Sequence, residues 1–318
     1  MANDTTTEHD TTTEQGTTTE HGTTTEQNGL QALRGGATAV LRALDSVFEG
    51  WGVAAGAESV ILPPVLPVAA LAKLDFYENF PHHAFVVSAL DLDRRGIGYG
   101  SELLDFPPDK LEPAELGLPS AACFAVYLHL QGRRLAASRT VTVLGRCFRR
   151  EEYYEGLRRL VGFHMREVVA LGSNEFTAEH LRRFSDRILA FGAALELPMS
   201  RDAATDPFYD RGGQRALLQK LAPVKHEFVV EGLAIASVNV HRNFFGERCD
   251  IRLADTGAPV FTSCAAFGLE RWLSVLHTRY GSWPAALAAV RAAARRVALT
   301  AGVALPAGAG GSVDAPRP

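Results

Sequence analysis

Two β-patterned runs, 140–148 (TVTVLGRCF) and 162–172 (GFHMREVVALG), follow each other with only a polar segment between them. Their β-branched and apolar residues favour strands, and a polar turn between such runs is typical of a hairpin. Similar runs recur at 228–240 (FVVEGLAIASVNV) and 257–267 (GAPVFTSCAAF). Strands joined by hairpin-length turns predict a sheet that is mainly antiparallel.

Helical periodicity occurs between these strands. Apolar residues recur at helical spacing over 30–50, despite a Gly-Gly pair at 35–36, and most clearly over 177–195. Further helices are expected at 123–131 and 269–280. Earlier in the chain, VILPPVLP predicts a short strand that its prolines end before the helical VAALAKL, and HAFVVSAL predicts another strand. The fold class is therefore α+β, a mainly antiparallel sheet flanked by helices.

The folded part is expected to be one domain over 30–303. Residues 5–28 repeat TTTE four times with no large apolar side chain, which predicts that 1–29 form a disordered tail. Residues 304–318 are rich in Pro and Gly, which predicts a flexible tail. The whole chain of 318 residues is 47% hydrophobic. A substantial core can therefore form between the two tails.

Charge and cysteine content exclude several classes of protein. The chain has 32 Lys and Arg against 36 Asp and Glu, a net charge of −4, which does not suit clamping a long nucleic acid. The N-terminus lacks the basic and apolar regions of a signal peptide, and no apolar run reaches the ~18 residues of a membrane span. We expect a cytoplasmic protein whose four cysteines are core thiols or metal ligands.

Arg149 and Glu151 are the first candidate site residues. If they continue a strand, their i and i+2 spacing places both side chains on the same face, where they can contact one ligand. The planar guanidinium of Arg149 suits a phosphate, and the carboxylate of Glu151 can accept a hydrogen bond from an amine. An isolated Arg-x-Glu is more often a surface ion pair. The sequence 264–272 (CAAFGLERW) adds a second pattern, in which Gly268 precedes Glu270 and Arg271 at a helix start.

These two patterns together resemble motifs 2 and 3 of the class II aminoacyl-tRNA synthetases, and the Pro63-Pro64 segment resembles motif 1. Within that class, the chain is most similar to the amino acid:[carrier protein] ligases, truncated homologues of atypical zinc-dependent seryl-tRNA synthetases. The similarity covers most of 55–280 and depends on the order of the strings PPVLP, FYENFP, CFRRE, FHMRE, DPFY, IASVN and CAAFGLERW. No single string carries it.

The resemblance implies a role for each matching residue. Arg149 would bind the α-phosphate of ATP, Arg271 the γ-phosphate, and both would stabilise charge during the reaction. Glu151 would accept from the adenine amino group, and Phe163 would stack on adenine, although a buried strand Phe would also fit the core. The remaining ATP-binding candidates are Arg159, Leu160, Lys225, Ser237 and Asn239. Mg²⁺ would accompany ATP, and the chain has no P-loop sequence.

Cys123, Glu167 and Cys264 are the candidate metal ligands. Their wide separation in sequence would by itself favour three buried structural residues. Their places relative to the motifs resemble the ligands of one zinc ion per chain, whose open fourth position takes the substrate's α-amino group. Glu167 would thus also face the substrate amino acid. Cys147 and Cys249 are expected to be structural, and His164 and His241 to face the other side of the sheet.

The implied activity is adenylation of a small amino acid, glycine or alanine, and its transfer to the phosphopantetheine thiol of a holo carrier protein. Aminoacylation of tRNA is the alternative, but the short polar start supplies no tRNA-binding domain. A non-catalytic paralogue that binds an amino acid is a third hypothesis. The motif 1 resemblance implies a homodimer. Arg182, Arg183 and Arg187 are candidate carrier contacts, unless they form an ordinary solvated helix face.

Overall fold

The protein is described by a computed structural model covering residues 29–92, 103–210, 212–213, 217 and 224–301. The predicted tails therefore lie outside the described residues, except for Gly29. The carbonyl of Gly29 accepts a hydrogen bond from the backbone N–H of Val161 at 3.0 Å. Gly29 is therefore hydrogen bonded to the connection that follows β6.

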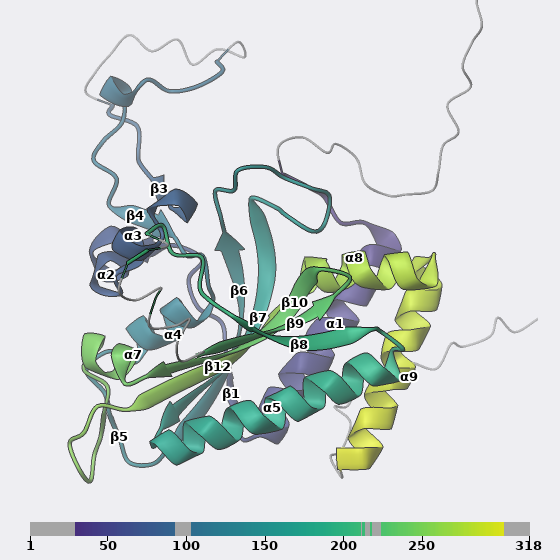
Figure 1. Cartoon of the computed structure of the whole chain (residues 1–318). Coiled ribbons are helices and arrows are strands. Elements are labelled where there is room, and N and C mark those ends of the chain that lie inside the picture. The colour runs from purple at the N-terminus through teal and green to yellow at the C-terminus, as the bar shows by residue number, and fades with distance from the viewer. Residues whose placement is uncertain (1–28, 93–102, 211, 214–216, 218–223, 302–318) are drawn as a thin grey trace, which may run out of the picture.

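A seven-stranded sheet forms the centre of the molecule, in the order β1-β6-β7-β12-β10-β9-β8 (Figure 1). All neighbours are antiparallel except β1 and β6, which are parallel. The strands are β1 (Glu58–Val60), β6 (Arg139–Phe148), β7 (Gly162–Gly172), β8 (Met199–Ala204), β9 (Lys225–Val230), β10 (Leu233–Arg242) and β12 (Phe261–Gly268). The predicted α+β class with a mainly antiparallel sheet is confirmed.

Long helices cover one face of this sheet. They are α1 (Gly35–Ala54), α5 (Asn174–Ala194), α8 (Leu269–Tyr280) and α9 (Trp283–Ala301). Aromatic packing joins them to the strands, because the ring of Phe48 on α1 stacks on Phe267 of β12 at 4.1 Å and also contacts Trp272 of α8. All three rings are fully buried, so this layer is the larger core.

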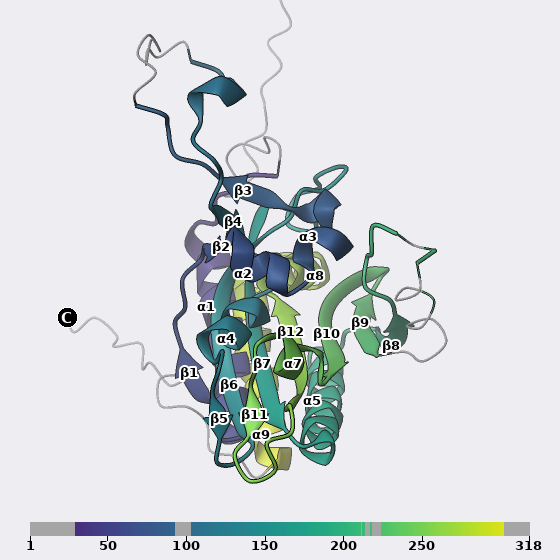
Figure 2. The ribbon, with the colours of Figure 1, turned by 90° about the vertical axis from the view of Figure 1, so that its left-hand side faces the viewer.

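Shorter elements lie over part of the opposite face (Figure 2). Four helices and a three-stranded sheet make up most of this layer: α2 (Val68–Lys73), α3 (Phe76–Asn79), α4 (Cys123–His129), α7 (Phe244–Arg248), β2 (Leu66–Pro67), β3 (Phe85–Val87) and β4 (Leu116–Leu118). Two 3-10 turns (Pro81–His83 and Pro108–Lys110) and the pair β5 (Arg134–Leu135) and β11 (Arg252–Leu253) complete it. The face that this layer shares with the sheet holds the site described below.

Several elements differ from the sequence-based expectations. The first helix begins at Gly35 rather than near Leu30, and Gly35 has a positive φ of 48°, so the Gly-Gly pair starts the helix instead of interrupting it. β8 and α9 were not predicted. No helix in the described part of the chain is both long and apolar enough to cross a membrane.

Candidate active site

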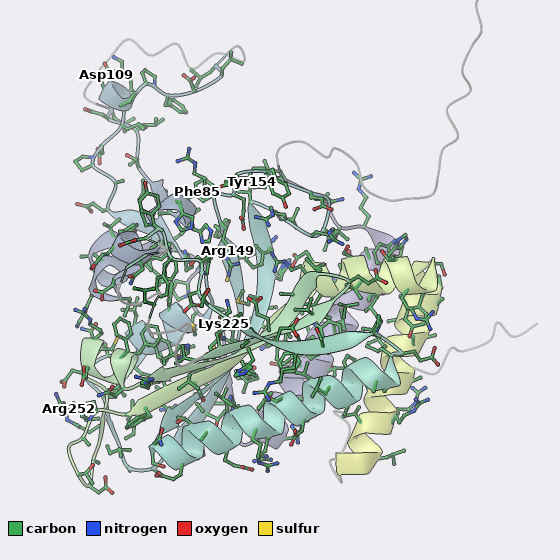
Figure 3. All side chains as sticks on the ribbon, in the orientation of Figure 1. Phe85, Asp109, Arg149, Tyr154, Lys225 and Arg252 are labelled. Carbon is green, nitrogen blue, oxygen red and sulfur yellow. The ribbon has the colours of Figure 1, made fainter. Side chains whose placement is uncertain are left out.

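A cleft lies where β7, β10 and β12 meet the start of α8. Arg149 and Lys225, which Figure 3 labels, both line it. Most of the predicted nucleotide-binding residues line it: Arg149, Glu151, Arg159, Leu160, Phe163, Lys225, Ser237 and Arg271. Alternate residues of a strand face the same side, so Phe163 and Met165 of β7 both reach the cleft. Gly268 and Glu270, which the sequence pattern included without a role of their own, also line the cleft. Two further charged lining residues, Arg158 and Glu227, were not predicted.

Arg149 and Glu151 reach the cleft by a different route from the one expected. β6 ends at Phe148, so both residues lie in the connection after the strand and do not continue its alternation. The Arg149 guanidinium donates to the carbonyl of Ser120, at 3.3 Å from Nε and 3.1 Å from Nη2. It also lies 5.1 Å from the centre of the Phe163 ring, within the range of a cation–π contact.

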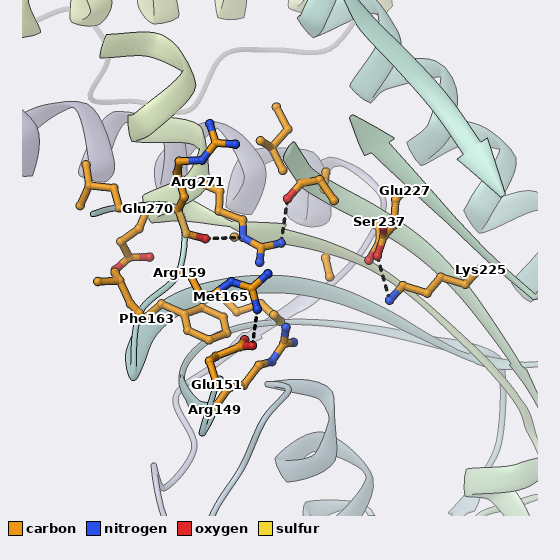
Figure 4. Close-up of a pocket in the computed structure, with 18 residues that line it drawn as sticks. Arg149, Glu151, Arg159, Phe163, Met165, Lys225, Glu227, Ser237, Glu270 and Arg271 are labelled. Atoms are coloured by element: carbon orange, nitrogen blue, oxygen red, sulfur yellow. Dashed lines mark hydrogen bonds and ion pairs between the residues drawn. The ribbon is translucent and has the colours of Figure 1, made fainter. Parts of the chain in front are cut away.

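Glu151 is paired inside the cleft. Its Oε2 accepts from Arg159 Nη1 at 2.6 Å, as Figure 4 shows, and its side chain is only 11% exposed. The Arg159 guanidinium also lies over the ring of Tyr153 at 4.4 Å. Arg159 thus holds the Glu151 carboxylate in a fixed position while Glu151 retains its second oxygen as an acceptor.

Arg271 enters the cleft from the first turn of α8. Its Nε donates to the carbonyl of Arg158 and its Nη1 to the carbonyl of Ala234, each at 3.0 Å (Figure 4). Burial lowers the pKa of Arg271 to about 10, so the group is still cationic at neutral pH. The neighbouring Glu270 is buried and accepts from the backbone N–H of His164, with its Oε1 2.7 Å from His164 Nδ1.

Lys225 and Ser237 line the side of the cleft formed by β9 and β10. Lys225 Nζ lies 3.0 Å from Glu227 Oε1 and 3.5 Å from Asp206 Oδ1. Asn239, which we expected beside Ser237 in the nucleotide site, does not line the cleft. Its amide lies deeper, between Ser237 Oγ at 3.1 Å and Cys264 Sγ at 3.4 Å.

The three candidate metal ligands come together from three elements. Cys123 begins α4, Glu167 lies in the middle of β7, and Cys264 lies in β12. All are buried, and their ligand atoms lie within 4.8 Å of one another. The spacing in sequence gave no sign of this, because the sheet brings β7 and β12 side by side and α4 packs over β6 and β7.

A glycine on β6 allows this approach. A Cβ added to Gly145 would lie 2.6 Å from the Cβ of Ala122. Only glycine therefore lets the segment before α4 lie so close to β6. The backbone N–H groups of Ala122 and Cys123 then donate to Glu167 Oε1, at 2.8 Å and 3.1 Å.

The cluster has the donor set of a metal site. Glu167 Oε2 is buried and has no hydrogen-bond partner among the described residues. Burial raises the pKa of Glu167, and the contact with Cys264 together with burial raises the pKa of Cys123. Two thiols and a carboxylate that ionise reluctantly would be stabilised as anions by a cation, and two sulfurs with one oxygen suit tetrahedral zinc.

His241 occupies a place that the sequence analysis assigned wrongly. The register between β10 and β12 shifts between Val240 and Arg242, and at this irregularity the His241 side chain faces the metal cluster rather than the other side of the sheet. Its Nε2 lies 3.8 Å from Cys264 Sγ and its Nδ1 3.2 Å from the Tyr127 hydroxyl. The period-two spacing of Ser237, Asn239 and His241 was the available signal in the sequence, although the pairing itself is irregular at His241. His164, by contrast, alternates with Phe163 and contacts Glu270.

Cys147 and Cys249 lie outside the cluster of three ligands. Both are fully buried in the core of the α4 layer. Burial raises the pKa of Cys249 to about 11 and that of Cys147 further. Both thiols would therefore be protonated at neutral pH, as expected of structural cysteines.

The basic residues predicted to contact a carrier lie away from the cleft. α5 packs on the opposite face of the sheet, where Ser263 Oγ donates to the carbonyl of Thr177. Arg182 is paired with Glu179 and Asp186 on its own helix, and Arg187 donates to the carbonyl of Trp51. Arg182 and Arg183 are exposed and Arg187 is half-buried, and a carrier contact at this helix face stays a prediction.

Comparison with known proteins gives the family. No protein-family model matches the chain. Amino acid–[acyl-carrier-protein] ligase 1 of Bradyrhizobium diazoefficiens is 34% identical over 253 residues, 73% of this chain and 75% of the relative. The chain belongs to the amino acid–[acyl-carrier-protein] ligase family. Ligase 2 of the same organism is 32% identical over 72% of this chain and 73% of its own length.

The ligase is more distantly similar to seryl-tRNA synthetases. The type-2 serine–tRNA ligase of Methanocaldococcus jannaschii is 25% identical over 77% of this chain but 51% of its own length. The seryl-tRNA synthetase of M. kandleri, solved with a tRNA, superposes with a TM-score of 0.71 at 20% identity, covering 89% of this chain and 59% of that one. That of Pyrococcus horikoshii, solved with ATP, gives 0.61 at 15% identity, covering 80% and 54%. These structures confirm the class II synthetase catalytic fold.

Proposed function

We propose that this ligase uses ATP to activate a small amino acid as an aminoacyl adenylate and transfers it to the phosphopantetheine thiol of a carrier protein. The observation that carries the proposal is the adjacency of the cleft and the metal cluster. On β7, Met165 lines the cleft and Glu167 belongs to the cluster, and on β12 the same holds for Ala266 and Cys264. The names of the two Bradyrhizobium relatives support the substrate classes.

The spacing of residues along a strand gives the distance between the cleft and the metal cluster. Two residues along a strand span roughly 7 Å. An α-amino acid can bridge this separation when its amine binds a metal ion at the cluster and its carboxylate points toward the cleft. A substrate whose amino group is held at the cluster would thus present its carboxylate to the arginine-lined cleft. Zn²⁺ held by Cys123, Glu167 and Cys264 would supply the open position that binds a neutral amine.

The cleft residues suit adenylation. The carboxylate attacks the α-phosphorus of ATP, the bond from that phosphorus to the bridging oxygen breaks, and pyrophosphate leaves. Arg149 and Arg271 would neutralise charge on the phosphates together with Mg²⁺. Glu151, held by Arg159, would accept from the adenine amino group, and Phe163 would stack on the base. Ser237 and Lys225 would line the ribose and phosphate side.

A packed aromatic wall beyond the metal cluster favours a small substrate. The ring of Tyr127 stacks on Phe245 at 4.1 Å, and His241 lies 5.0 Å from the same ring. Tyr127 and Phe245 are buried, and the His241 ring reaches to within 3.8 Å of Cys264. Glycine and alanine, with little or no side chain, are therefore the proposed substrates.

Transfer to tRNA is the second candidate, because relatives at 24–26% identity are named serine–tRNA ligases. The net charge of −4 argues against a broad nucleic-acid surface.

We also propose that the ligase acts in the cytoplasm as a homodimer.

An ATP–pyrophosphate exchange assay with a panel of amino acids tests the activation step. We expect exchange with glycine or alanine, none with large amino acids, and loss of exchange after zinc is removed by a chelator. The Cys249→Ser variant is a matched thiol control that should exchange normally. A folded, zinc-loaded protein that exchanges with no amino acid would show instead that it is a non-catalytic paralogue.

A further inference from the structure

Asn239 lies between the nucleotide cleft and the metal cluster. On β10 it is the direct partner of Cys264 in the pairing with β12. Its side-chain Nδ2 donates to Cys264 Sγ at 3.4 Å and to Ser237 Oγ at 3.1 Å. The two N–H groups of one amide can thus bind a metal-ligand sulfur and a hydroxyl of the cleft at the same time.

His241 places a second nitrogen near the same sulfur. Its Nε2 lies 3.8 Å from Cys264 Sγ, while its Nδ1 lies 3.2 Å from the hydroxyl of Tyr127 and 3.4 Å from that of Thr262. A hydroxyl that donates to Nδ1 leaves the ring proton on Nε2, which faces the sulfur. The stacked rings of Tyr127 and Phe245 fix the imidazole in this orientation.

We propose that Asn239 and His241 are positioning residues that donate N–H hydrogen bonds to the Cys264 thiolate and thereby tune the metal ion. This inference rests on the metal site of the proposed function. Two thiolates and one carboxylate bring three negative charges to a divalent ion. Hydrogen bonds to one thiolate withdraw part of its charge, so the ion is a stronger acceptor for a neutral amine.

Asn239 also links the metal site to the nucleotide cleft. Because Ser237 Oγ accepts from the Asn239 amide, the hydroxyl proton of Ser237 is directed elsewhere and can be donated into the cleft that Ser237 lines. Asn239 therefore acts on both substrates of the first half-reaction, whereas His241 acts on the metal side alone. This difference separates the two residues in an experiment.

The test measures metal binding without amino acid, carrier or turnover. Zinc is titrated into the metal-free full chain against a chromophoric chelator, for wild type and for Asn239→Ala, Asn239→Asp and His241→Phe. Asn239→Asp keeps the shape of the side chain but replaces the amide donor by a carboxylate beside the thiolate. His241→Phe keeps an aromatic ring but removes the ring nitrogens. Asn243→Ala is the matched control, because the Asn243 amide bonds the exposed Glu247 carboxylate.

We expect the zinc Kd to rise roughly 10- to 100-fold in the three site variants, the range for lost outer-sphere partners, and to stay unchanged in Asn243→Ala. In the Co²⁺-substituted proteins, the thiolate-to-metal charge-transfer band should move to longer wavelength, because the sulfur becomes richer in electrons. ATP should bind more weakly to Asn239→Ala but normally to His241→Phe. A merely structural role would not move the Co²⁺ band.

Thermal unfolding identifies any variant that fails to fold. If Asn239→Ala does not fold, the zinc Kd and Co²⁺ spectrum of Asn239→Asp and His241→Phe test the inference. If wild type binds zinc and the folded variants match its zinc Kd and Co²⁺ spectrum, the inference is wrong while the proposed function stands. If wild type itself binds no zinc, the proposed metal site is wrong and the inference is overturned with it.

Discussion

Arg149 and Arg271 enter the cleft from opposite sides, the end of β6 and the start of α8 (Figure 4). The Arg149→Ala substitution removes the guanidinium that we propose binds the α-phosphate of ATP. We therefore predict that Arg149→Ala lowers pyrophosphate exchange by roughly 10²-fold or more, as loss of one preorganised charge stabiliser does. Arg271→Ala should do the same and also lower Tm, because two backbone carbonyls lose their donor.

Arg182→Ala serves as the control for these arginines, since Arg182 is exposed on the other face of the sheet and bonded only to carboxylates of its own helix in the contacts described. It should exchange at the wild-type rate. A folded Arg149→Ala protein with normal exchange would contradict the role of Arg149.

Cys264 and Cys249 are both buried, yet only Cys264 lies in the ligand cluster. We predict that Cys264→Ser lowers the zinc content of the purified protein from about one ion per chain to almost none, because a neutral serine hydroxyl is a much weaker ligand than a thiolate. Cys249→Ser should retain the metal. Elemental analysis of the two variants decides this. Active wild type without zinc would contradict the ligand assignment.

At the scale of elements, His180 on α5 couples the helix to β7. Its Nε2 lies 3.1 Å from the carbonyl of Val168, and the side chain is buried. Burial lowers the pKa of His180 to about 4, against 6.5 in the unfolded chain. Between these values the unfolded chain binds more protons than the native protein, so stability falls as the pH is lowered through this window.

We therefore predict that the free energy of unfolding drops by about 2 kcal/mol more in wild type than in His180→Gln between pH 7 and pH 5. Glutamine keeps an N–H donor for Val168 but does not titrate. Urea unfolding at the two pH values measures the difference. A residual slope is expected in both proteins, because burial also lowers the pKa of His83 and His241 to about 4. Equal losses in the two proteins would contradict the role of His180.

The strands and the ligand residues differed in how far sequence could predict them. β7 and α8 have the predicted bounds, because period-two and helical apolar patterns are local properties. The Cys123, Glu167 and Cys264 set followed from family resemblance alone, since strand pairing across long separations decides which residues meet. Arg149 and Glu151 were placed wrongly on a strand, because polar residues at the end of β6 do not show where pairing stops.

At the scale of the whole molecule, apolar residues are exposed both next to the edge strand β1 and on the small three-stranded sheet. Ile61, just after β1, is 97% exposed, and Val86 and Leu116 of the small sheet are 55% and 40% exposed. Their burial against a second copy would be favourable. We predict a dimer at micromolar concentration and a shift toward monomer in Ile61→Asp, measured by equilibrium sedimentation.

Leu299→Asp is the control for this substitution, because Leu299 is also an exposed apolar residue, at 83%, but belongs to α9 instead of the sheet edge. It should leave the dimer intact. Wild type that sediments only as monomer would contradict the predicted assembly.

The acceptor of the aminoacyl group tests the central claim most directly. A flexible phosphopantetheine arm can enter the cleft while its carrier touches little of the ligase, whereas a tRNA needs an extended positive surface. The assay contains the ligase, ATP, Mg²⁺ and labelled glycine or alanine. Three acceptors are tested in separate reactions: a holo carrier protein, the same carrier without its phosphopantetheine arm, and total tRNA. The account predicts label on the holo carrier alone. Label on tRNA with none on the holo carrier would contradict it.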